Sequence, residues 1–272
     1  FGGFQLLGLQ DFPGQGTALV GLFNALLESK GALTPAEFRQ FCAPHVLLAR
    51  FDRHTWTTGE SFTADLDLAH YGPADLPAGT LTWELLTNVG ACLQANPTTD
   101  RLQAGSYAGT LAVPAAPAGG LRRLGELRFP LPATTTAQTV ELRLSFSAGS
   151  DSITAAYPLW LYPAADHLFS IPQPPSVVLL RTSSLSSLVS RLASGSRVLL
   201  LPDAAHPFAH TPGGAFMSDF WCWTMFHNQP GTLGLLIDHE HPALAGFPTA
   251  AHSDWQWFHL AQAAQPLVLD SL

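Results

Sequence analysis

Apolar and polar residues alternate along the middle part of the chain. In residues 62–71, every second position (Phe62, Ala64, Leu66, Leu68, His70) falls on one side of an extended segment, which is typical of a half-buried strand. Gly- and Pro-containing turns separate similar segments, and we expect strands at 46–51, 62–71, 80–86, 105–113, 124–129, 139–146 and 153–161. Short strands at this spacing predict an antiparallel, immunoglobulin-like β-sandwich over residues 44–163, with Trp83 and Trp160 in its core.

Residues 1–43 change from an extended to a helical pattern. An apolar run at positions 4–9 precedes Gln10, Asp11 and a Pro-Gly turn, and apolar residues then recur at helical spacing over 17–30. The sequence Thr34-Pro35-Ala36-Glu37 predicts a capping box that opens a second helix. Because an initial strand has no earlier strand to pair with, we expect the chain to be part of something larger.

Apolar runs and a helical segment alternate in residues 164–272. The runs at 177–180, 197–203 and 233–238 are continuous, and residues 185–192 have helical periodicity. This alternation predicts a parallel sheet that is covered on both faces. The pattern as a whole therefore predicts three domains, at residues 1–43, 44–163 and 164–272.

Composition excludes some classes of function. The 272 residues include 12 Lys and Arg against 20 Asp and Glu, a formal net charge of −8, so no nucleic-acid partner is expected. No apolar run approaches the roughly 18–20 residues of a spanning helix, so no membrane partner is expected. Cys42, Cys92 and Cys222 form no metal or redox motif; buried free thiols are the simplest interpretation, and one disulfide stays open.

Two motifs resemble a known enzyme family. Gly2-Gly3-Phe4, Gln10-Asp11 and the longer segment 9–21 resemble the end of the catalytic barrel of glycoside hydrolase family 2. The segment 247–257 resembles a late aromatic segment of a large β-galactosidase-like subgroup from Bacteroidetes, and the resemblance covers essentially the whole chain. It implies that residues 1–43 are the last β/α unit of a (β/α)8 barrel.

The resemblance also implies an activity and a location for the parent protein. The chain is expected to be the C-terminal part of a retaining enzyme that acts on β-linked sugars without a cofactor. Since the chain carries no signal peptide, its periplasmic or secreted location follows from the resemblance alone. The implied partners are a carbohydrate substrate and either the remainder of the parent chain or a second copy of this chain.

The third domain is similar to class I glutamine amidotransferases, which have a doubly wound α/β sheet. Active members place a Cys on a strand–helix elbow and pair it with a His. Cys222 lies instead in an aromatic run without a Gly elbow, and His227 is only five residues away. We therefore expect residues 164–272 to be a non-catalytic domain.

No catalytic residue is assigned in this chain. Retaining glycosidases need two carboxylates roughly 5–5.5 Å apart. In the family both come from barrel strands before the eighth, and no motif of this chain matches them. The chain alone is therefore expected to be inactive towards glycosides.

Four residues are candidate sugar contacts. Gln10 and Asp11 follow a strand, and that end of a barrel strand lines the active site; alternatively, Asp11 caps the turn or the next helix. Trp255 and Trp257 carry indole rings, which stack on the apolar faces of sugars. Trp255 and Phe258 are also spaced as a buried helix face would be, so core packing stays an alternative.

Two further patterns are weaker. His239 and His241 alternate with acidic residues and, with a carboxylate, have the donors for zinc, but a solvated loop before Pro242 is the simpler interpretation and no metal is assigned. Gly14 and Gly16 resemble a phosphate-binding loop, but no Lys follows them.

The sequence leaves three functions open. The first is the C-terminal part of a glycoside hydrolase with a structural role. The second is a non-enzymatic carbohydrate-binding module, in which the sandwich or the aromatic-rich domain binds sugar. The third, ranked last, is a hydrolase that uses Cys222.

Overall fold

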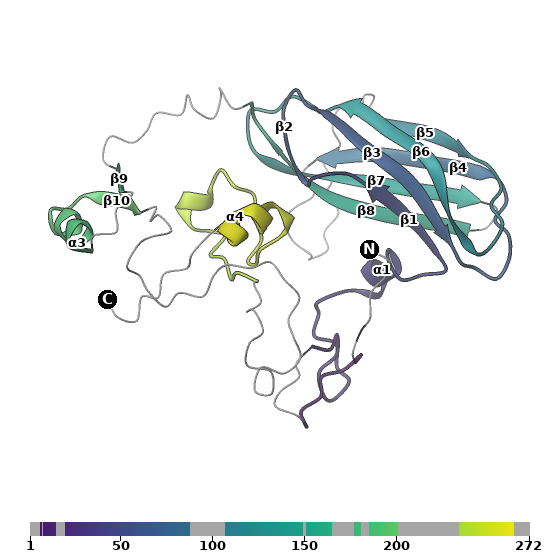
Figure 1. Ribbon diagram of the computed structural model, residues 1–272, viewed down its shortest axis with the longest axis horizontal. Helices are drawn as coiled ribbons and strands as arrows, with labels where there is room; N and C mark the ends of the chain where they lie inside the picture. Colours follow the sequence, from purple (N-terminus) through teal and green to yellow (C-terminus); the bar gives the residue numbers. More distant parts are fainter. Residues whose placement is uncertain are drawn as a thin grey trace.

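Strands dominate the described residues between positions 45 and 162. The computed structural model describes residues 6, 8–14, 20–87, 107–148, 151–164, 177–180, 185–200 and 234–263. Its first eight strands form what we call the sheet body (Figure 1): β1 (His45–Arg50), β2 (Thr55–Thr57), β3 (Ser61–His70), β4 (Gly79–Thr87), β5 (Ala108–Val113), β6 (Gly120–Pro130), β7 (Gln138–Ala148) and β8 (Asp151–Tyr162).

The sheet body consists of two sheets. One has the strand order β1-β3-β6, and the other has the order β2-β8-β7-β4-β5. Neighbouring strands are antiparallel except for β2, which pairs with β8 in parallel. The sequence pattern had predicted a purely antiparallel body. The parallel pair of β2 and β8 shows that this prediction is wrong at that edge.

Both sheets contribute to one hydrophobic core. In β3 the predicted alternation is confirmed, since the core side carries residues that are at most 2% exposed: Phe62, Ala64, Leu66 and Leu68. The other sheet contributes residues that are at most 1% exposed: Leu81, Leu142, Leu144 and Phe146. Burying a large apolar side chain contributes about 1.5–3 kcal/mol. A register slip by one residue would turn such a row outwards, so burial sets the strand register.

The helix α1 (Pro35–Arg39) begins at the predicted capping box. The Thr34 hydroxyl oxygen accepts from the Glu37 backbone N–H at 3.2 Å. The Glu37 carboxylate accepts from the Thr34 backbone N–H at 2.7 Å. These two bonds satisfy N–H groups that have no partner inside a helix, which explains why a helix of only five residues begins here.

The helix predicted over residues 17–30 is wrong in its described part, residues 20–30. The Asn24 side-chain oxygen accepts from the backbone N–H groups of Leu26 and Glu28, at 2.9 and 3.0 Å. Such bonds offer the backbone an alternative to the helix, and Leu27 has a φ of 65°. The segment therefore turns back on itself, and its described residues form no β/α unit of a barrel.

The C-terminal part contains short elements. The strands β9 (Val177–Leu180) and β10 (Arg197–Leu200) pair in parallel, with α3 (Leu185–Ala193) between them in sequence and apart from the sheet body in Figure 1. Exposures of 39–52% for Val177, Leu179 and Leu199 show that this strand pair is not covered on both faces. The described residues 234–238, predicted as part of a strand, form only an isolated bridge from Leu236 to His252.

The predicted fold class is therefore wrong. It combined a (β/α) barrel end, an antiparallel immunoglobulin-like sandwich and an amidotransferase-like α/β domain. The described residues contain neither a barrel nor a doubly wound sheet; they are mostly strand, followed by the short elements η1 (Pro242–Leu244), η2 (Trp255–Trp257) and α4 (Phe258–Ala263). The domain boundaries after residues 43 and 163 stay predictions. No helix in the described part of the chain is long and apolar enough to cross a membrane.

Candidate functional site

Residues 247–257, which we call the docking segment, lie against one end of the sheet body. The indole Nε1 of Trp160 donates to the carbonyl oxygen of Pro248 at 3.1 Å. The Tyr162 hydroxyl donates to Oε1 of Gln256 at 2.8 Å. Both donors belong to β8, so the end of this strand holds the segment at two points.

Gln256 is the buried centre of the docking segment, with 7% exposure. Its Nε2 donates to the carbonyl oxygen of Pro248 at 2.7 Å and to Oδ2 of Asp254 at 3.1 Å. Together with the bond from Tyr162, these contacts use both N–H groups and the oxygen of the amide. A buried amide in this state fixes the backbone around it, because any shift would leave a polar group unsatisfied.

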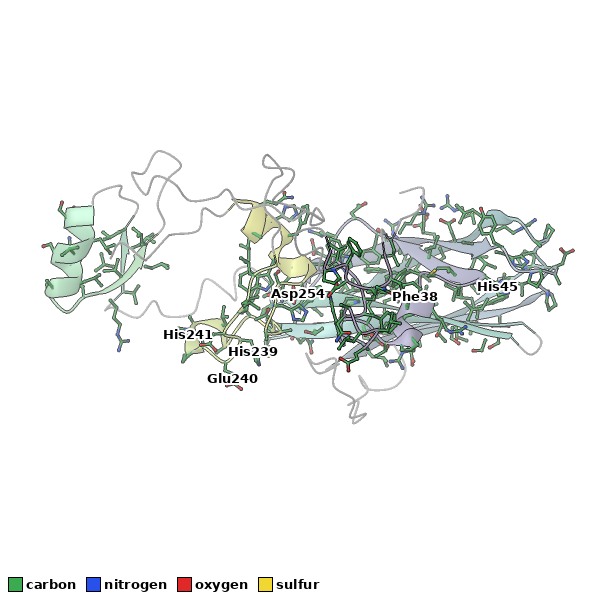
Figure 2. The ribbon with its side chains drawn as sticks, turned by 90° about the horizontal axis from the view of Figure 1, so that it is seen from below. Phe38, His45, His239, Glu240, His241 and Asp254 are labelled. Carbon is green, nitrogen blue, oxygen red and sulfur yellow. The ribbon has the colours of Figure 1, made fainter. Side chains whose placement is uncertain are left out.

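Asp254 opens η2, the short helix that presents the two candidate tryptophans. Its Oδ1 accepts from the Gln256 backbone N–H at 3.1 Å, so it acts as the N-cap. Figure 2 shows Asp254 beside the sheet body, whereas His239, Glu240 and His241 lie farther out. The cap and the buried Gln256 fix the backbone on both sides of Trp255.

Trp255 stacks on His54, a residue between β1 and β2. The ring centroids are 5.4 Å apart and the planes differ by 8°. Trp255 remains 54% exposed. The structure thus presents an indole that rests on an imidazole and offers much of its surface to solvent. We call Trp255 and His54 the aromatic platform.

Burial governs the charges near the aromatic platform. It lowers the pKa of His54 below the ordinary value, because the charged ring loses solvation, while the Pro158 carbonyl and Asp254 act in the opposite direction. Burial also raises the pKa of Asp254. The pKa of Tyr162 is raised by burial and by the charge of Asp254, so its hydroxyl remains a donor to Gln256.

Trp257 packs inwards instead of forming part of the platform. Its Nε1 donates to the Thr249 hydroxyl at 2.8 Å. Its ring meets Phe247 edge-on, with centroids 4.9 Å apart. Of the two predicted tryptophan contacts, only Trp255 is among the strongly exposed residues, and Trp257 serves the packing of the docking segment.

Asp11 is engaged in a structural role. It is 5% exposed and accepts from the Gly21 backbone N–H at 2.9 Å and from Lys30 Nζ at 2.9 Å. The hydrogen bond from Lys30 lowers the pKa of Asp11, so the group stays charged. Gln10 is exposed and forms a bridge to Phe23. This pair lies on a different segment from the two tryptophans.

The acidic-histidine segment is a turn. Nδ1 of His241 accepts from the backbone N–H of Ala243 at 3.1 Å and caps η1. Across the described ranges, no group of three His, Cys, Asp or Glu side chains is placed to hold a metal ion. Gly16, Cys92, Cys222 and His227 lie outside the described residues.

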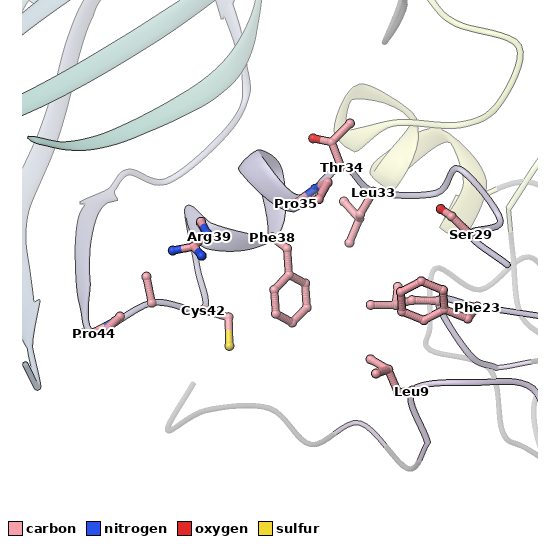
Figure 3. Close-up of a pocket in the computed structure, with 12 residues that line it drawn as sticks. Leu9, Phe23, Ser29, Leu33, Thr34, Pro35, Phe38, Arg39, Cys42 and Pro44 are labelled. Atoms are coloured by element: carbon pink, nitrogen blue, oxygen red, sulfur yellow. The ribbon is translucent and has the colours of Figure 1, made fainter. Parts of the chain in front are cut away.

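An apolar pocket of about 520 Å³ lies between α1 and the preceding turn (Figure 3). Leu9, Phe23, Leu33 and Phe38 form its walls, with Cys42 at its edge. The Cys42 thiol is free and exposed, in contrast to the buried thiol expected from the sequence.

A pair of histidines joins β1 to β3. Nδ1 of His45 and Nδ1 of His70 are 2.9 Å apart, so one ring donates and the other accepts. His70 is fully buried, and its Nε2 has no hydrogen-bond partner within the described residues. The pair is a feature of the sheet body and contributes no group to the aromatic platform.

Sequence reasoning singled out Trp255 but not His54, on which its ring stacks. The two residues lie about two hundred positions apart, and His54 belongs to no motif. Its only signal is that an aromatic residue adjoins a short strand, which many core positions share. Its role emerges only when the docking segment meets β8.

Comparison with known proteins divides the chain into two matched regions. Residues 60–163 match a family described as a domain of unknown function (DUF8488), and residues 180–272 match another with the same description (DUF8487). The bond from Tyr162 to Gln256 therefore joins the two regions. Comparison with curated proteins gives no match.

Three similar solved structures each have 10% sequence identity to this chain. Spo0M, a sporulation control protein from Bacillus subtilis, is 10% identical with a TM-score of 0.31, over 44% of this chain and 50% of that chain. The β-glucuronidase of Parabacteroides merdae is 10% identical with a TM-score of 0.28, over 43% of this chain and 14% of that chain. A cohesin module from a Clostridium perfringens family 33 glycoside hydrolase is 10% identical with a TM-score of 0.26, over 45% of this chain and 99% of that chain.

Proposed function

We propose that this chain is the non-catalytic C-terminal part of a β-galactosidase-like glycoside hydrolase that acts on β-linked sugars. The two motifs at residues 9–21 and 247–257 support this, through their resemblance to glycoside hydrolase family 2. The observation that carries it is that the second motif coincides with the docking segment, which is bonded to the sheet body and presents Trp255. The same resemblance supports a periplasmic or secreted location.

The chemistry of the parent enzyme would be a double displacement. One carboxylate attacks the anomeric carbon, a second protonates the leaving group, and water then releases the sugar from the covalent intermediate. In this chain Asp11 is paired with Lys30, and Asp254 accepts two bonds from Gln256. Both carboxylates are engaged in structural contacts, which supports the non-catalytic role proposed for the chain.

An activity comparison tests this proposal. The full-length parent protein should hydrolyse an aryl β-galactoside, and the chain of 272 residues should not. Release of the chromophore is measured at equal molar concentrations. Turnover by the chain alone would contradict the proposal. A lack of turnover by the full-length parent protein would also contradict it.

The second candidate function is a non-enzymatic carbohydrate-binding module. The exposure of Trp255 (54%) favours it, because an exposed indole held in one orientation suits the apolar face of a pyranose. Affinity electrophoresis of the chain through gels that contain a soluble β-linked galactan tests this function. Migration equal to that in a gel without polysaccharide would contradict it.

A further inference from the structure

We propose that the aromatic platform is a composite site, in which His54 is the positioning residue for Trp255 and sugar binding is coupled to docking. The ligand class is a saccharide with an apolar pyranose face. This inference rests on the proposed sugar contact of Trp255 and adds how that contact is assembled and regulated.

His54 is fixed by the sheet body. Its carbonyl oxygen accepts from the Trp160 backbone N–H at 2.9 Å, and its ring Nδ1 lies 2.8 Å from the carbonyl oxygen of Pro158. A carbonyl only accepts, so Nδ1 carries the proton. The ring also meets Phe51 edge-on at 4.9 Å. The imidazole is therefore a fixed support on which a second ring can rest.

Trp255 is fixed by the docking segment. Its neighbours Asp254 and Gln256 are bonded to each other, and Gln256 is bonded to Tyr162 of β8. The orientation of the indole thus depends on two parts of the chain at once. If the docking segment leaves β8, the indole loses His54 as well.

This arrangement links two equilibria. A sugar that binds the assembled platform, and not the undocked segment, must stabilise docking by mass action. Conversely, every contact that stabilises docking raises the apparent affinity for the sugar, because affinity scales with the population of the binding-competent form. Tyr162 therefore influences sugar binding through Gln256. Its hydroxyl acts indirectly, because it is engaged in the contact between β8 and the docking segment.

Four variants of the full chain test the coupling by affinity electrophoresis in a soluble β-linked galactan. W255A should abolish retention. H54A should weaken the apparent affinity about two- to tenfold, the range expected for one lost ring pair, and H54F should recover part of it. Y162F should also weaken binding, since it removes one bond of the docking contact.

Y157F is the matched control. The Tyr157 hydroxyl bonds to Leu47 and Ala49 within the sheet body, so its removal affects the body without touching the docking segment. Y157F should leave retention unchanged. Far-ultraviolet circular dichroism and thermal unfolding establish that each variant is folded, and H54F replaces H54A if the latter is not.

The outcomes separate the two proposals. If the native chain is not retained, or W255A is retained as strongly as the native chain, the sugar contact itself is wrong. If W255A loses retention while H54A, H54F and Y162F bind like the native chain, the sugar contact stands and the composite site is wrong. Equal losses in Y162F and Y157F would also contradict the coupling, because the effect would then come from general stability.

Discussion

The carboxylate of Asp11 holds structure near the beginning of the described residues. Its charge is stabilised by Lys30 and by one backbone N–H, and it ties the start of the chain to the turn before α1. A polar residue after an apolar run has the pattern of a substrate contact. Its near-complete burial and its ion pair are instead typical of a structural anchor.

We expect the anchoring effect of Asp11 to depend on pH. Because its pKa is lowered from the ordinary value of 3.8, the anchoring is present at neutral pH and is lost as the pH falls below that value. Hydrogen exchange at the Gly21 amide measures it, corrected for the intrinsic rate. In D11N the amide should exchange faster at pH 7, with little further change on acidification. Equal protection in both proteins would show that the ion pair contributes nothing.

The core residues of the sheet body carry most of its stability. Leu81 is fully buried, and truncation leaves a cavity, so L81A should lower the free energy of unfolding by about 2–5 kcal/mol. L121A is the control, since Leu121 is 60% exposed and its loss should change stability by about 0.5 kcal/mol or less. Urea titration followed by circular dichroism measures both. Similar losses in the two variants would contradict the assignment of the core.

At the scale of elements, the capping box decides where α1 begins. Five residues cannot sustain a helix by propagation alone, so the caps are decisive. T34A should destabilise α1 by about 0.5–2 kcal/mol. E37Q keeps an oxygen acceptor for the Thr34 N–H and should cost less. Amide exchange at Glu37, Phe38 and Cys42 measures the effect, and slower exchange in T34A than in E37Q would contradict it.

Local rules predicted the elements that local interactions determine. The strand at 62–71 and the capped helix at Thr34 follow from alternation and from one hydrogen-bond motif, and both are confirmed. The helix over 17–30 had the right spacing of leucines in residues 20–30, but Asn24 bonds the backbone in a turn there. The strand predicted at 233–238 is wrong in its described part, residues 234–238, because Leu236 is 96% exposed in an isolated bridge and no sheet among the described residues buries this run.

At the scale of the whole molecule, the unpredictable part is the contact between distant segments. Nothing near Gln256 in sequence indicates that it is buried against Tyr162, and nothing near His54 indicates a partner at Trp255. The barrel was implied by the resemblance to glycoside hydrolase family 2, and the doubly wound sheet by the similarity to class I glutamine amidotransferases together with the order of the elements. Element order does not specify which faces are covered, and the exposed Val177, Leu179 and Leu199 show that the pair of β9 and β10 is not covered on both faces.

Docking joins the two matched regions, so its pH dependence reports on the whole molecule. His54 has a pKa lowered from 6.5. Below pH 6.5 the His54 imidazole is therefore protonated more readily in the undocked form than in the docked form. Docking should weaken as the pH falls, because protonation favours the undocked form. Asp254 acts oppositely and at lower pH, because its pKa is raised from 3.8 and the docked carboxyl takes up a proton more readily.

Hydrogen exchange of peptides covering residues 247–257, corrected for intrinsic rates, measures docking between pH 7 and 5. H54F should remove the loss of protection on acidification, while D254N should retain it. An unchanged pH profile in H54F would mean that another group controls docking, because the phenyl ring keeps the stacking surface and lacks only the titrating nitrogens.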